Sequence, residues 1–113
     1  MNKKSIALLT ATLLFAALGS ANVHAAVDDA DAQKLLKDSK CLKCHDVVKT
    51  KKGKPYQKIA SEYKGKPSAI AELTKHVTEP SQVEVEGEKV DHGIAKTRDA
   101  ARIQNLVEWI LAR

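Results

Sequence analysis

The most constraining feature of this chain is the run Cys41-Leu42-Lys43-Cys44-His45, in which two cysteines two residues apart are followed directly by a histidine. The sequence of 113 residues contains only these two cysteines. No thiol therefore remains for a structural disulfide or for a second pair of metal-binding cysteines. Cysteines at this spacing lie about one helical turn apart, so both sulfurs can reach along one edge of the same flat ligand.

Such a motif is typical of covalent haem attachment. We expect Cys41 and Cys44 to form thioether bonds with the two vinyl groups, and His45 to bind the iron as its proximal ligand. The second ring nitrogen of His45 then needs a hydrogen-bond acceptor that sets the tautomer and the ring orientation. The motif therefore predicts one covalently bound haem c.

Two other interpretations of the cysteine pair are open from the motif alone. A zinc site would use Cys41, Cys44, His45 and His92 as its four ligands. A thioredoxin-like redox pair would need a βαβ context, and the sequence shows no such pattern. The features that predict export favour haem over both.

The first 25 residues have the pattern of a secretory signal peptide. A basic start is followed by an apolar run over residues 6–18, and Val23-His24-Ala25 places compact residues before the expected cleavage site. We predict cleavage after Ala25 and a single domain over residues 26–113, located in the periplasm. The apolar run is short for a membrane span and no later stretch is apolar enough, so an uncleaved anchor is the less favoured alternative.

The expected mature domain is short and poor in large apolar side chains. Its aromatic residues are Tyr56, Tyr63 and Trp109, for which core packing is the favoured interpretation. A chain of this size buries only a marginal core by itself. Because a covalently held haem supplies a large apolar body at the centre, we expect the apoprotein to be poorly folded.

The charge of the chain is positive and unevenly distributed. The 19 Lys and Arg residues against 14 Asp and Glu residues give a net charge of +5, which falls to about +3 when Lys3 and Lys4 leave with the signal peptide. This modest charge and the predicted export argue against nucleic acid as a partner. Basic residues near the haem motif predict redox partner proteins with acidic docking surfaces, although each single lysine also serves solubility. We call these residues the lysine collar: Lys37, Lys40, Lys43, Lys49, Lys51, Lys52 and Lys54.

Apolar residues at helical spacing predict four helices joined by loops. Asp28 or Asp29 is the expected cap of the first helix, Pro55 starts the second, Pro80 stops the third, and Thr97 or Asp99 caps the fourth. A small hairpin fits residues 81–93, where valines alternate with glutamates. The apolar positions that define the helices are Ala32, Leu35, Leu36, Tyr56, Ile59, Ala60, Tyr63, Ile70, Leu73, Val77, Ile103, Leu106, Val107, Ile110 and Leu111.

With these segments in order, residues 26–113 resemble the short monohaem class I cytochromes c of bacteria. The resemblance rests on the haem motif after a first helix, on residues 53–56 and 59–65, and on the last helix with Leu106-Val107-Glu108-Trp109-Ile110-Leu111. It implies an all-α fold in which the first and last helices cross and the haem edge faces solvent. It also implies that a carbonyl near Pro55 accepts a hydrogen bond from His45.

The chain departs from that family at the sixth iron ligand, which is usually a methionine sulfur. Met1 is the only methionine and lies in the predicted signal peptide. His92 stands in the loop where the family methionine would be, and Gly93 lets the backbone approach the porphyrin. We predict that His92 is the distal ligand, which lowers the reduction potential relative to sulfur ligation. The alternatives are His76, a lysine such as Lys89 or Lys96, and an open sixth position.

Two functional hypotheses follow. The first is a periplasmic one-electron carrier with bis-histidine ligation, because the chain shows no catalytic carboxylate pair, nucleophile triad or phosphate-binding loop and is therefore not expected to be an enzyme. The second is a gas-binding or redox-sensing haem protein in which His92 leaves the iron on reduction. A carrier of this size is expected to be a monomer, with tight binding to one dehydrogenase as a further alternative.

Overall fold

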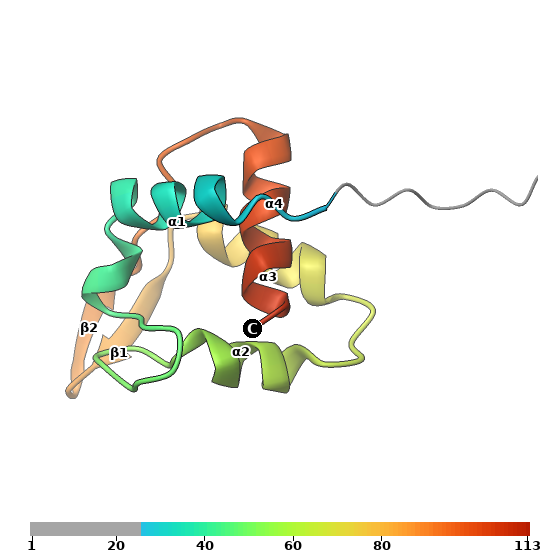
Figure 1. Cartoon of the computed structure of the whole chain (residues 1–113). Helices are drawn as coiled ribbons and strands as arrows, with labels where there is room; N and C mark the ends of the chain where they lie inside the picture. The colour runs from blue at the N-terminus through green and yellow to red at the C-terminus, as the bar shows by residue number, and fades with distance from the viewer. Residues whose placement is uncertain (1–25) are drawn as a thin grey trace, which may run out of the picture.

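The computed structural model describes residues 26–113, which form four α-helices, one short 3₁₀-helix and a two-stranded hairpin (Figure 1). This confirms the predicted all-α class, to which the hairpin is a small addition. The predicted signal peptide, residues 1–25, lies outside the described residues. None of the helices in the described part has the length and apolar character needed to span a bilayer. In chain order the elements are α1 (Asp29–Asp38), η1 (Cys41–Lys43), α2 (Tyr56–Tyr63), α3 (Ala69–Thr78), β1 (Gln82–Val85), β2 (Glu88–Asp91) and α4 (Ala100–Leu111).

Helices α1 and α4 begin at aspartate caps. The Asp28 carboxylate accepts a hydrogen bond from the amide of Asp31 at 3.0 Å, and the Asp99 carboxylate accepts one from the amide of Ala101 at 2.9 Å. Each carboxylate thereby satisfies an amide that has no partner within its own helix. Of the residues predicted as caps, the structure selects Asp28 and Asp99.

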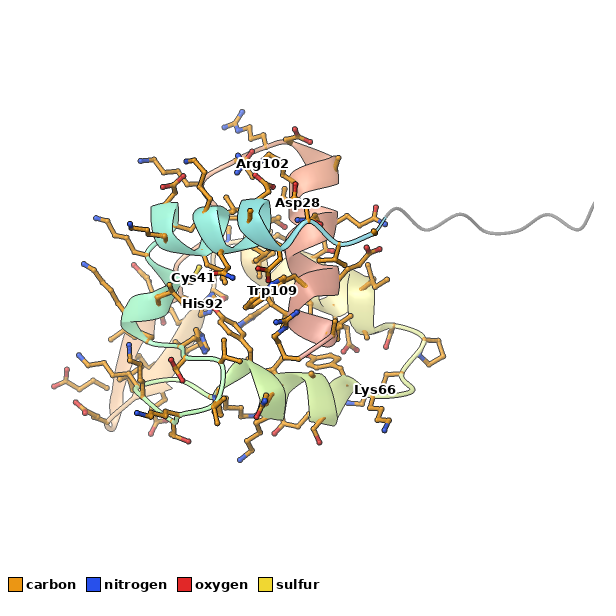
Figure 2. All side chains as sticks on the ribbon, viewed as in Figure 1. Asp28, Cys41, Lys66, His92, Arg102 and Trp109 are labelled. Atoms are coloured by element: carbon orange, nitrogen blue, oxygen red, sulfur yellow. The ribbon has the colours of Figure 1, made fainter. Side chains whose placement is uncertain are left out.

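The first and last helices cross, as the family resemblance implied (Figure 1). Polar side chains fasten this crossing at its edge. Arg102 of α4 forms a salt bridge with Asp31 of α1, with Nη2 and Oδ1 2.8 Å apart, and the Trp109 indole donates to the Asp29 carboxylate. Both of these α4 residues are labelled in Figure 2, on the side of the helix that faces α1. At the centre of the crossing lie fully buried apolar side chains: Leu35, Leu36, Leu106 and Val107.

Helix α3 packs against α4, and of its predicted buried side Leu73 and Val77 are confirmed, whereas Ile70 is not. The prediction that Ile70 is buried is wrong, because 43% of its surface is exposed, whereas Ala69 and Leu73 are buried. Ala69 and Leu73 are four residues apart and share one stripe of the helix, while Ile70 is turned about 100° away from Ala69. The small side chain of Ala69 faces the core in place of the larger isoleucine next to it.

These differences in burial predict that truncating Leu106 and truncating Ile70 lower the free energy of unfolding by unequal amounts. Leu106→Ala should destabilise the haem-loaded protein by about 3 kcal/mol, because a fully buried leucine leaves a cavity when truncated. Ile70→Ala on the exposed side of α3 should change the free energy of unfolding by about 0.5 kcal/mol or less. Urea unfolding followed by circular dichroism measures both, and equal losses would contradict the burial seen here.

The hairpin brings the chain back toward the haem motif. Its strands pair antiparallel, with Val83 opposite Val90, and its tight turn has left-handed backbone at Glu86 (φ 53°) and Gly87 (φ 84°). Two successive left-handed residues give a turn whose twist matches that of the strands. Val83, Val85 and Val90 line a cavity between the hairpin and the haem motif, so the hairpin forms one apolar wall of the candidate site.

Candidate haem-binding site

A cavity of about 760 Å³ lies between the haem motif, the end of α3 and the hairpin. Its walls contain all four residues predicted from the sequence: Cys41, Cys44, His45 and His92. Figure 2 shows Cys41 and His92 in the same interior region, on the side of the molecule that carries η1 and the hairpin. The volume is in the range of cavities that enclose a large organic ligand or cofactor.

The two cysteines occupy the ends of the 3₁₀-turn. Cys41 begins η1 and Cys44 follows its last residue, with the Cys44 amide donating to the Cys41 carbonyl at 3.2 Å. Both thiols are free, and burial raises the pKa of the Cys41 thiol. Within residues 26–113 no three His, Cys, Asp or Glu side chains are placed to hold a metal ion, so the zinc alternative gains no support.

His45 is oriented by a backbone carbonyl. Its Nδ1 lies 2.6 Å from the carbonyl oxygen of Lys54, the residue before Pro55. Nδ1–H donates this bond, and Nε2 is left to bind a metal. Tyr56 stacks on the imidazole, with ring centroids 5.2 Å apart and planes 26° apart. The carbonyl that the resemblance implied near Pro55 is therefore that of Lys54.

Gly53 is a site residue that the sequence analysis missed. A Cβ atom at this position would lie 2.7 Å from Cε1 and 3.0 Å from Nδ1 of His45. The Gly53 amide also donates to the Cys44 carbonyl at 2.8 Å, which draws this loop onto the haem motif. The position therefore excludes any side chain. The signal available in the sequence was a lone glycine in a lysine-rich loop just before Pro55.

Asp46 is the second residue missed, and it shapes the loop that follows His45. Its carboxylate accepts hydrogen bonds from the amides of Lys49 at 2.8 Å and Val48 at 3.0 Å, while its carbonyl accepts from the Tyr56 amide at 2.9 Å. The amides of Lys49 and then Val48 lower the pKa of this carboxyl below its usual value. An aspartate that folds back on its own following amides is a common turn signal, and it brings the Lys54 carbonyl to His45.

The lowered pKa of Asp46 predicts a pH-dependent contribution to stability. Because the folded protein favours the carboxylate, the contribution is present above the unfolded-state pKa of about 4 and is lost as pH falls through the lower folded-state value. Asp46→Asn should therefore lower the melting temperature of the haem-loaded protein at pH 7, and this difference from wild type should shrink toward pH 3. Glu88→Gln on the hairpin is the control, since that side chain is exposed to solvent. A difference that stays constant with pH would contradict the assignment.

His92 lies opposite His45. It follows β2 directly, and its ring centroid is 6.2 Å from that of His45, with the two planes 67° apart. Its Nδ1 is buried and has no hydrogen-bond partner within residues 26–113. Burial lowers the pKa of His92, and the neighbouring His76 and His45 rings lower it further. A neutral imidazole is the form that binds a metal.

The loop that carries His92 is fastened to three separate places, and we call residues 92–96 the distal loop. The amides of this loop donate to acceptors in the segment after α3, in α3 itself and at the end of α1. These bonds join His92 to the Ser81 carbonyl at 2.8 Å, Ala95 to the Val77 carbonyl at 2.7 Å, and Lys96 to Ser39 Oγ at 2.8 Å.

The structure separates the alternative sixth ligands. Lys89 and Lys96 are not among the residues that line the cavity, whereas His76 is. His76 lies against His92, with ring centroids 4.1 Å apart and planes 37° apart. The distal side of the cavity therefore holds two histidines in contact, which the sequence did not reveal.

Comparison with known proteins supports a haem protein. No protein-family model and no curated protein sequence matches the chain. Among solved structures, it is similar to the class 1 cytochrome MtoD from Sideroxydans lithotrophicus ES-1, with a TM-score of 0.73 and 38% identity over 77% of this chain and 97% of that one.

Two structures of Nitrosomonas europaea cytochrome c552 are also similar. The wild type has a TM-score of 0.56 and 24% identity over 70% of this chain and 95% of that one, a likeness that shows the fold alone. A deletion mutant has a TM-score of 0.57 and 25% identity over 71% and 96% of the two chains. These likenesses agree with the free cysteine pair, with the close approach of Gly53 to His45, and with a His92 Nδ1 that has no partner within residues 26–113, all of which fit a haem. The chain belongs to the class I cytochromes c, electron carriers with one covalently bound haem c.

Proposed function

We propose that this chain is a periplasmic one-electron carrier of low potential. Its haem c is attached through Cys41 and Cys44, and the iron is bound by His45 and His92. The observation that carries the axial assignment is the separation of the two imidazole rings across the cavity, 6.2 Å between centroids.

That separation agrees with a metal held between two imidazoles. A metal–nitrogen bond of about 2 Å on each side, plus about 1 Å from the bound nitrogen to the centre of its ring, gives about 6 Å between ring centres. The His76–His92 pair, with centroids 4.1 Å apart, is too close to enclose a metal in this way. His45 is also the ring whose free nitrogen is set by a carbonyl acceptor, as metal-bound histidines usually are.

The haem supplies the one-electron chemistry, and the chain sets its potential and its exposure. Two imidazoles in place of the family's imidazole and thioether remove the effect by which methionine raises the potential. The Lys54 carbonyl strengthens the same preference for the ferric state, because it makes His45 a stronger donor. Reversible electron transfer needs no substrate pocket or proton-transfer residue, which supports carriage rather than catalysis.

Redox partners with acidic surfaces fit the lysine collar. In this set Lys54 is paired with Glu62, at 2.9 Å, and Lys51 Nζ donates to the Leu42 carbonyl at 2.7 Å. Within residues 26–113 the five other members make no salt bridge, and their charge is free to steer an encounter that weakens with ionic strength: Lys37, Lys40, Lys43, Lys49 and Lys52. The signal-peptide pattern over residues 1–25 supports the periplasmic location. We propose a monomer in solution.

Replacing the distal ligand tests the function. His92→Ala should convert the ferric protein from low spin to high spin in its electron paramagnetic resonance spectrum, and the ferrous variant should bind carbon monoxide rapidly. Ferrous wild type should not react with carbon monoxide on the same timescale. Lys89→Ala in β2 is the matched control and should leave both measurements unchanged. An unaltered low-spin signal in His92→Ala would remove His92 as ligand, and rapid carbon monoxide binding by wild type would favour the gas-binding alternative.

A further inference from the structure

The two imidazoles that face each other across the cavity are held in different ways. His45 has a carbonyl acceptor for Nδ1 and a stacked aromatic ring, Tyr56. His92 has its backbone amide bonded to Ser81, but its buried Nδ1 has no hydrogen-bond partner within residues 26–113. The side chain in ring contact with His92, apart from the facing His45, is His76.

His76 comes from a rigid part of the structure. It lies in the last turn of α3, and two neighbours in the same turn are tied down, since the Glu79 amide donates to Lys75 and the Ala95 amide donates to the Val77 carbonyl at 2.7 Å. The second of these bonds joins the helix end to the distal loop. His76 and His92 are therefore presented to each other by two segments that are directly hydrogen-bonded.

We infer that His76 is a positioning residue for the distal ligand, because its ring packs against the His92 imidazole and fixes the orientation of that ring. This inference rests on the proposed role of His92 as iron ligand. Because the buried Nδ1 of His92 has no hydrogen-bond partner within residues 26–113, ring packing rather than a hydrogen bond holds this imidazole in place. The contact also resists rotation of the His92 ring about its own axis, which holds the 67° angle between the two axial planes.

Two measurements report on this role, one on the orientation of the His92 ring and one on the strength of the iron–His92 bond. The angle between axial imidazole planes determines the g-values of a low-spin ferric haem, so loss of the ring contact should move them. Loss of the packing partner should also weaken the iron–His92 bond, since removal of the outer partners of a metal ligand typically costs about 10–100-fold in metal affinity. In the ferrous protein carbon monoxide competes with His92, so the apparent affinity for carbon monoxide should rise by the same factor.

The experiment uses three replacements of His76 in the haem-loaded protein. His76→Ala removes the ring, and should both shift the g-values and raise the carbon monoxide affinity about tenfold or more. His76→Phe keeps an aromatic ring and should stay close to wild type in both measurements, whereas His76→Gln keeps a polar side chain without a ring and should behave like His76→Ala. Ile70→Ala, on the exposed side of the same helix, should match wild type in both.

The inference is overturned if His76→Ala has wild-type g-values and wild-type carbon monoxide affinity. If that variant does not fold, the same comparison between His76→Gln and His76→Phe decides, and identical behaviour of these two would overturn the inference. Failure of the underlying proposal has a different signature. His92→Ala would then keep its low-spin signal, whereas failure of the inference alone leaves His92→Ala high-spin and the His76 variants like wild type.

Discussion

A chain in which Cys41 and Cys44 are both replaced by serine is expected to lose cooperative folding at 25 °C. The reason is the cavity of about 760 Å³ that the two cysteines border. Keeping even a quarter of that volume dry and unfilled would cost about 5 kcal/mol at about 24 cal/mol per Å³. This is comparable to the lower end of the total stability of a small domain, about 5–15 kcal/mol. The apolar walls of the cavity must therefore collapse or fill with water when no haem is attached.

The composition of the core supports the same outcome. Within residues 26–113, four of the thirteen buried hydrophobic residues are alanines, and these add little apolar surface: Ala32, Ala60, Ala69 and Ala95. Far-ultraviolet circular dichroism with thermal melting measures the result. Cys41→Ser alone, which keeps one thioether bond, is the matched control and should retain haem and a cooperative melt. A sharp, native-like transition in the double variant would show that residues 26–113 fold without the haem.

The second large effect is expected from Gly53→Ala. The added methyl group would lie 2.7 Å from Cε1 of His45 and 3.2 Å from the Cys44 carbonyl oxygen, so the imidazole must move away from the Lys54 carbonyl. Loss of this bond should weaken the iron–His45 bond about 10–100-fold. Because protons compete with iron for the imidazole, the acid transition from low to high spin should move upward by about one to two pH units.

Gly87 offers a control in which an added side chain strains the backbone but collides with no neighbouring atom. It has φ +84° and nothing within 4 Å of an added Cβ, so Gly87→Ala should cost about 1 kcal/mol of stability through backbone strain alone. Its haem absorption spectrum should be that of wild type. A pH titration of the absorption spectrum and a thermal melt on both variants separate the two effects. If Gly53→Ala titrates like wild type, the glycine does not serve to bring the loop close to His45.

Much of the fold was predictable because the helices carry periodic apolar stripes and recognisable caps. Asp28 and Asp99 begin α1 and α4 as expected, and the proline at position 80 follows α3. Ile70 was predicted wrongly because a sequence pattern weighs a residue by its size. The structure instead buries the small Ala69, on the stripe of α3 that it shares with Leu73.

The candidate site was predictable where one segment contains the whole pattern. Cys41, Cys44 and His45 lie within five residues, and His92 was predicted because no methionine lies within residues 26–113. The contact between His92 and His76 has no such signature, since it depends on how the end of α3 meets the segment after β2. Gly53 was missed for a related reason: its importance lies in what a side chain would collide with, and that atom belongs to another part of the chain.

The distal loop has no helix or strand, yet its hydrogen bonds fix its backbone to the rest of the fold. Three backbone amides within these five residues donate to acceptors in three different parts of the fold. A coil segment fixed in this way opens only when several bonds break together, so its backbone should be as slow to open as the helices it joins. To open the sixth position of the iron by design, the side chain at position 92 should therefore be shortened. Changes that loosen the backbone of the distal loop would break its three hydrogen bonds to the rest of the fold first.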